Sequence, residues 1–107
     1  MLKLGKKMGV VEKWDSAKDG ALDEANMTKK LTAMGYKCQK FDYPAGKTFA
    51  EHSHREENRD CVLSGTFEVT IEGKTVKLGA GDMLLIPSNA KHSCKCDTAV
   101  VLIDAQK

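Results

Sequence analysis

Two stretches of this sequence carry most of its structural information: GKTFAEHSH at residues 46–54 and GDMLLIPSNAKH at residues 81–92. Each begins with a glycine, continues through strand-forming residues and ends on a histidine. The chain has three histidines in all, and they lie within these two stretches at His52, His54 and His92. A candidate site for chemistry therefore coincides with the parts of the sequence that are most informative about structure.

From residue 36 onward, short runs of apolar and β-branched residues alternate with turn signals rich in Gly, Pro, Asn and Ser. This rhythm is typical of a sandwich or barrel of antiparallel strands. We predict strands at residues 36–43, 48–54, 59–63, 66–71, 74–78, 83–86, 92–96 and 99–104. The sequence shows neither an internal repeat nor alternating helices that would favour a parallel sheet. It therefore predicts an all-β fold for this part of the chain.

The first third of the chain has a different pattern. Residues 8–11 resemble a short strand, and the polar segment that follows is rich in turn formers. A helix is predicted over residues 21–34, where Met27 and Leu31 lie one turn apart and Gly35 stands at the position of a C-terminal cap. A stripe of this kind usually packs against the main domain.

The length and composition favour one compact unit. A chain of 107 residues suits a single core, and its 41% hydrophobic and 30% charged residues are ordinary for a globular protein. We expect residues 1–35 to form a strand and helix extension that packs on a barrel of residues 36–107.

Charge patterning argues against a nucleic-acid partner. Seventeen Lys and Arg residues against fifteen Asp and Glu give a net charge of +2, and the basic residues are scattered among acidic ones. The first seven residues lack the apolar core of a signal peptide, and no window is apolar enough to span a bilayer. We therefore expect a cytoplasmic protein without a membrane role.

The four cysteines should be free thiols in that compartment. They are Cys38, Cys61, Cys94 and Cys96, and no two have the Cys-x-x-Cys spacing of a structural zinc site or a thioredoxin-like site. On a strand, Cys94 and Cys96 share the face of His92, so we expect them to line a pocket as soft walls and not as ligands. Cys61 is out of phase with the positions that face the pocket, so we expect it to be a core residue.

The spacing of the glycines and histidines resembles the two sequence motifs of the cupin superfamily. The first motif is matched by Gly46, His52, His54 and Gly65, and the second by Gly81, Pro87 and His92. The resemblance implies a small double-stranded β-helix, or jelly-roll barrel, with a metal ion in its mouth. It also implies a homodimer, to which residues 8–11 could contribute by adding a strand to an exposed sheet edge.

The departures from these motifs bear on the ligand set. Asn58 stands where the first motif usually has a Glu that supplies a fourth metal ligand, and Asn89 replaces a Gly of the second motif. Asparagine adopts the left-handed conformation readily, so the second change is compatible with the fold. A neutral amide oxygen is a poor donor beside imidazoles, so we expect Asn58 not to be a ligand. A one-residue bulge could instead bring Glu57 into the ligand position.

The histidine spacing also has a physical interpretation without the family. Alternate residues on a strand point the same way, so His52 and His54 present two imidazoles on one face. His92, from a later strand, completes a set of three with open coordination positions, as in catalytic metal sites. Imidazole accepts Fe, Zn, Ni, Mn and Cu, so the expected cofactor is a divalent transition metal of unspecified identity.

The same alternation picks out a carboxylate. Counting in twos from Asn58, Asp60 should also face the barrel interior. A buried Asp needs a partner, so Asp60 could support a ligand histidine, bind the metal from a distance or act as a base. Equally, it could bond the backbone at a strand irregularity. Arg55 and Arg59 alternate to the other face, so the pocket lacks the usual partner of a carboxylate or phosphate substrate.

Three functions are compatible with these residues, because the fold alone decides none of them. The three-histidine set without a carboxylate resembles that of cupin dioxygenases, in which ferrous iron acts on thiols, diketones or aromatic acids. An isomerase of sugars or small polar molecules would use the metal as a Lewis acid and Asp60 as a base. A non-catalytic cupin would bind or sense a small molecule.

Overall fold

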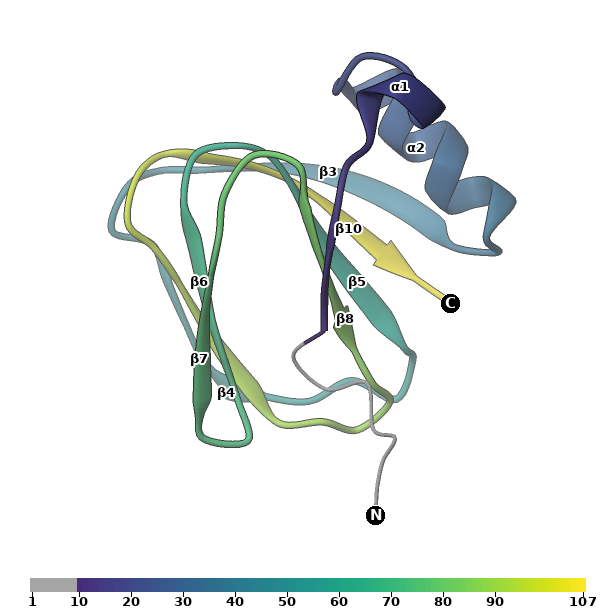
Figure 1. Ribbon diagram of the computed structural model, residues 1–107. Coiled ribbons are helices and arrows are strands. Elements are labelled where there is room, and N and C mark those ends of the chain that lie inside the picture. Colours follow the sequence, from purple (N-terminus) through teal and green to yellow (C-terminus); the bar gives the residue numbers. More distant parts are fainter. Residues whose placement is uncertain (1–9) are drawn as a thin grey trace.

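The computed structural model describes residues 10–107 and consists of two antiparallel sheets with two short helices at one end (Figure 1). One sheet contains, in spatial order, β2 (Val11–Lys13), β8 (Asp82–Ile86), β5 (Asn58–Ser64), β10 (Val100–Gln106) and β3 (Lys37–Tyr43). The other contains β4 (Thr48–His52), β9 (His92–Cys96), β6 (Phe67–Ile71) and β7 (Lys74–Leu78). The helices are α1 (Ser16–Asp19) and α2 (Glu24–Ala33).

Successive strands mostly alternate between the two sheets, and this crossing pattern confirms the predicted all-β jelly-roll fold. Only β6 and β7 are consecutive neighbours in one sheet, joined as a hairpin. Every strand predicted after residue 35 is present, with ends that differ from the predicted ones by at most two residues. The segment predicted over residues 48–54 ends as a strand at His52, which pairs with His92, the first residue of β9.

The main core lies between the two sheets and follows the predicted alternation. Strand β6 shows it most clearly, because Phe67, Val69 and Ile71 are buried and the residues between them are partly exposed. From the opposite sheet, Val62 and Leu102 pack into the same cluster. Burying a side chain of this size stabilises a fold by about 1.5–3 kcal/mol, so this cluster supplies much of the driving force for closing the sheets on each other.

A second core lies between α2 and the outer face of the five-stranded sheet. Met27 and Leu31 of the helix are fully buried there against Cys61, Met83 and Ile103. In Figure 1 the helices lie beside the ends of β3 and β10. The buried helix stripe is therefore confirmed as a packing surface. The division into units of residues 1–35 and 36–107 stays a prediction.

The helix is shorter than predicted, and a second one precedes it. Helix α2 begins after Asp23, whose side chain accepts a hydrogen bond from the Asn26 amide, and it ends before Met34, which is 38% exposed. The preceding turn-rich segment contains α1, which begins after Asp15. In both cases a short acidic side chain caps the helix, a local signal that the apolar pattern does not contain.

The N-terminal strand pairs within its own chain. Residues 8 and 9 of the predicted strand lie outside the described residues, and the strand begins at Val11, which pairs with Leu84 of β8. Strand β2 thus covers an edge of its own sheet. The homodimer stays a prediction. Within residues 10–107, neither helix has the length or the apolar character needed to cross a bilayer.

We predict that Gly65→Ala destabilises the fold by about 2–4 kcal/mol. Gly65 has a φ of 88°, and a Cβ atom there would lie 2.1 Å from the carbonyl oxygen of Ala99. Gly73→Ala is the matched control, because Gly73 has a φ of 83° and open space around its Cα. Urea denaturation should show a cost of only about 1–2 kcal/mol for the control. Equal losses in both variants would contradict the steric explanation.

Candidate metal centre

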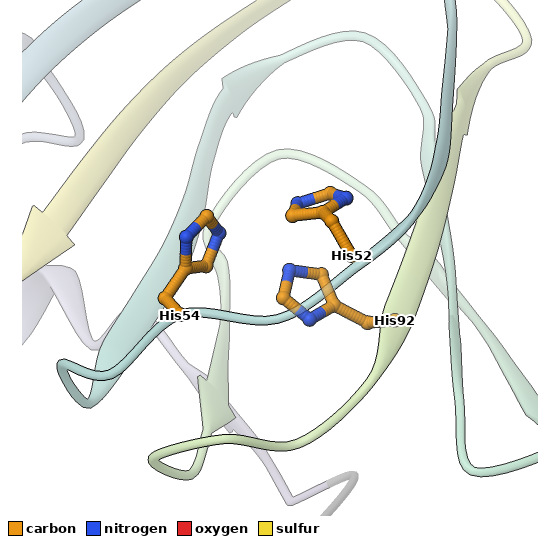
Figure 2. A group of neighbouring side chains, drawn as sticks. All are labelled: His52, His54 and His92. Atoms are coloured by element: carbon orange, nitrogen blue, oxygen red, sulfur yellow. The ribbon is translucent and has the colours of Figure 1, made fainter.

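The three histidines converge at one end of the space between the sheets (Figure 2). Their candidate ligand nitrogens all lie within 4.8 Å of one another. The centroid of the His52 ring is 4.8 Å from that of His54 and 4.2 Å from that of His92. A group of this size could hold one metal ion, and it is the only such group of His, Cys, Asp or Glu side chains within residues 10–107.

The backbone places these side chains through strand pairing and one loop contact. His52 of β4 and His92 of β9 are direct partners in the antiparallel pair. His54 lies two residues beyond the end of β4, in the loop. Its carbonyl oxygen accepts a hydrogen bond of 2.7 Å from the Asn89 amide. Asn89 has a φ of 66°, so it adopts the left-handed conformation expected of it in place of the motif's glycine.

Hydrogen bonds orient two of the three rings. The Nδ1 atom of His52 lies 2.7 Å from the carbonyl oxygen of Ala50, and Nδ1 of His92 lies 2.9 Å from that of Ala90. A carbonyl oxygen only accepts, so each Nδ1 carries the proton and each Nε2 keeps a free lone pair. Burial lowers the pKa of His92, which favours the neutral ring. The donor set therefore fits a divalent transition metal.

A cavity of about 220 Å³ opens beside the histidines, between the two sheets. Its apolar walls are largely aromatic, and its polar lining is acidic or neutral. The apolar lining residues are Phe41, Tyr43, Phe49, Phe67, Cys94 and Leu102. The polar ones, besides the histidines, are Asn58, Asp60 and Asp104. No Lys or Arg of the described chain lines it, in agreement with the prediction that the arginines point elsewhere.

Asp60 faces this cavity as predicted and has an acidic neighbour that sequence reasoning missed. Asp60 on β5 and Asp104 on β10 are direct register partners, and both line the cavity. Counting in twos from Leu102 along β10 would have indicated Asp104. Burial, and then the charge of Asp104, raise the pKa of Asp60 to about 7. Burial also raises the pKa of Asp104, opposed by a hydrogen bond from Asn58.

Backbone carbonyls, and not Asp60, contact the Nδ1 atoms of His52 and His92. No hydrogen bond joins Asp60 to a histidine within residues 10–107. Glu57, which the sequence offered as an alternative ligand, directly precedes β5 and is not among the residues that line the cavity. Its carboxylate accepts a hydrogen bond from the Tyr36 hydroxyl and pairs with Lys107 at 3.9 Å.

Asn58 is 2% exposed and lines the cavity from the start of β5. Its Nδ2 donates a hydrogen bond of 3.0 Å to Oδ1 of Asp104. Its Oδ1 is buried without a hydrogen-bond partner among the described residues. The position that holds Glu in the motif thus presents an amide oxygen instead of a carboxylate.

The cysteines are free thiols, as predicted, and only one of them lines the cavity. Cys94 lines it as expected, whereas Cys96 is buried deeper, in the main core. Cys61 lies in the second core beneath α2, which confirms the prediction that it is a core residue. Cys38 packs beside that core.

Comparisons with known proteins give a consistent picture. A family model described as a cupin domain matches residues 39–105. An RmlC-like cupin from Shewanella frigidimarina is 30% identical, with a TM-score of 0.63 over 66% of this chain and 64% of that one. A salicylate 1,2-dioxygenase from Pseudaminobacter salicylatoxidans is 27% identical, also with a TM-score of 0.63, over 66% of this chain but only 20% of its own.

A conserved protein of unknown function from Streptococcus pyogenes shows the same fold at 21% identity and a TM-score of 0.63. The match covers 66% of this chain and 62% of the streptococcal protein, so the chain spans about three fifths of that relative. A search of curated proteins gives no match.

We predict that burial of Asp60 makes the metal-free protein less stable as the pH rises from about 4 to about 7. The folded chain keeps the Asp60 proton up to about pH 7, whereas the unfolded chain loses it near pH ~4. The folded state therefore binds more protons in this window, and each rise in pH costs stability. Asp60→Asn removes this cost, so the variant should exceed the wild type at pH 8 by on the order of 2–4 kcal/mol.

Urea denaturation at several pH values measures this difference, which should shrink toward zero near pH ~4. Asp42→Asn is the matched control, because Asp42 is an acidic residue on β3 with a side chain that is 69% exposed. It should show no such trend. A difference for Asp60→Asn that stays constant with pH would refute the prediction.

Proposed function

Because the chain belongs to the cupin domain family, we propose that it is a metal-binding cupin in which His52, His54 and His92 hold one divalent transition metal. The observation that supports this most directly is the convergence of the three ring nitrogens within 4.8 Å. Two carbonyl contacts at Nδ1 leave the Nε2 atoms free as ligands. Imidazole donors do not distinguish Fe, Zn, Ni, Mn and Cu, so the ion's identity is a matter for measurement.

Within this proposal, a dioxygenase-like reaction on a small molecule is the first candidate. The donor set is three neutral imidazoles, and the salicylate 1,2-dioxygenase that shares the fold has been solved with gentisate bound. A bound ferrous ion would supply the chemistry of oxygen activation. The chain itself contributes a cavity lined by Phe41, Phe49 and Phe67, which excludes water from a ligand held beside the histidines.

A second candidate is an isomerase, and one observation favours it. The pKa of Asp60, raised to about 7 by burial and by Asp104, suits a general base near neutral pH. In that reaction Asp60 would take a proton from a ligand bound in the cavity and return it at another atom. A third candidate, a module that binds or senses a small molecule without turnover, needs only the cavity and the metal.

We predict that replacing His52, His54 or His92 with Ala lowers metal occupancy by at least about tenfold and leaves the barrel folded. Each imidazole supplies one of three ligands, whereas the fold depends on the apolar cores. Metal analysis of protein purified without a histidine tag, combined with circular dichroism, measures both quantities. Wild-type occupancy in all three variants would refute the site.

Asn58→Ala is the informative control for this experiment. We expect it to keep its metal, because the Asn58 amide is a poor donor beside imidazoles. The substitution should instead remove the hydrogen bond that Asp104 accepts from the Asn58 side chain. A fall in metal affinity as large as that of a histidine variant would make Asn58 a ligand and contradict the three-histidine set.

We predict oxygen consumption when the ferrous protein, reconstituted without air, is mixed with one class among thiols, diketones and phenolic acids. His92→Ala should abolish the uptake, and the zinc-loaded protein should show none, because zinc has no redox chemistry. An oxygen electrode measures the rate. Absence of uptake with every class would reject the dioxygenase candidate and leave the isomerase and binding candidates.

A further inference from the structure

We propose that the cavity beside the three histidines selects a small organic cation, a protonated amine on an apolar body about the size of one aromatic ring, over an anion of the same shape. This inference names the ligand class of the same cavity and rests on the proposed function for the identity of the site. It is carried by an unpaired acceptor, a pair of carboxyl groups and an aromatic wall.

The unpaired acceptor is Oδ1 of Asn58. The orientation of this amide is fixed by its own bond, because turning it over would aim the oxygen at the Asp104 carboxylate, which also accepts. Oδ1 is therefore left buried without a partner among the described residues. An unsatisfied buried acceptor costs about 1–3 kcal/mol, and a ligand N–H that bonds it would recover part of that cost.

The pair of carboxyl groups makes the cavity favour a positively charged ligand. Asp60 and Asp104 line the cavity from adjacent strands, and neither belongs to the histidine group that could hold a metal. The two residues are direct register partners, and a pair of carboxyl groups that has lost one of its two protons carries one negative charge. The described residues supply no Lys or Arg to this lining, so in the metal-free protein a cationic ligand can balance this charge.

The aromatic wall suits the body of such a ligand. Phe41 and Tyr43 stack with ring centroids 5.6 Å apart, and Phe49 meets Tyr43 edge-on at 5.0 Å. Ring faces attract a cation and repel an anion. The cavity volume of about 220 Å³ admits one ring with a short substituent, since an apolar cavity of about 150 Å³ holds benzene.

The test compares benzylamine, benzyl alcohol and benzoate, which share one ring and differ in charge. Binding is measured by calorimetry or protein-detected NMR at pH 7.5, with metal-free protein in EDTA and, separately, with zinc-loaded protein. We expect metal-free protein to bind benzylamine at least about tenfold more tightly than benzoate, with benzyl alcohol between them. The net charge of +2 works against this order, so bulk attraction cannot produce it.

Two variants and a control connect the preference to the carboxyl pair. Asp104→Asn keeps an oxygen that can accept from Asn58, and Asp60→Asn keeps the shape of the other group, so both should fold. Each should reduce the preference at least about threefold. Asp42→Asn removes the same charge from the exposed side of β3, and it should leave the preference unchanged.

Equal or tighter binding of benzoate to metal-free protein, or no binding of benzylamine, would overturn the inference. A fall in preference in Asp42→Asn as large as that in the cavity variants would overturn it too. The zinc-loaded arm separates the two proposals. If the histidines bind zinc but the protein shows no preference for benzylamine over benzoate, only this inference is wrong. If metal-free protein prefers benzylamine but the histidines do not bind added zinc, the proposed function is wrong and the cation site remains.

Discussion

The two-residue alternation of β5 and β10 is the constraint on which the rest of the structure depends. These neighbouring strands lie at the centre of the five-stranded sheet and are covered on both faces. Val62 and Leu102 point into the barrel, whereas Cys61 and Ile103 point outward beneath α2. A shift of one residue would exchange the two sets, so both cores fix the register that pairs residues 58–62 of β5 with residues 102–106 of β10.

That register also places the polar groups of the site. Asp60 stands two residues before Val62, and Asp104 two residues after Leu102, so both carboxyl groups enter the barrel with the apolar side chains. Like charges directly opposite each other on a sheet are destabilising, and burial adds to the cost. Apolar residues at these positions would stabilise the fold more. The pair is therefore best explained by what the cavity binds.

Sequence reasoning reached the strands and the histidines because both depend on local patterns. The alternation of apolar and polar residues in β6 and the glycines of the turns can be recognised in the sequence, and His52, His54 and His92 occupy motif positions. The inward phase of Asp60 followed from counting along one strand.

The features that were missed depend on pairing between distant segments or on short polar caps. The end of β4 at His52 coincides with the first residue of its partner β9, and α1 begins after a single capping residue, Asp15. Cys96 shares the inward phase of Cys94 but lies deeper, because depth in a barrel is set by the opposing sheet. The place of Asp104 beside Asp60 follows only from the pairing of β10 with β5.

The substitution of Asn58 for the motif's Glu connects these observations. With three neutral imidazoles as its protein ligands, a bound divalent ion would keep its full charge. In the structure the Asn58 amide bonds Asp104, so the negative charge lies on the cavity wall instead of in the ligand set. The metal would therefore remain a strong Lewis acid, and the two carboxyl groups would lie on the wall of the cavity beside it.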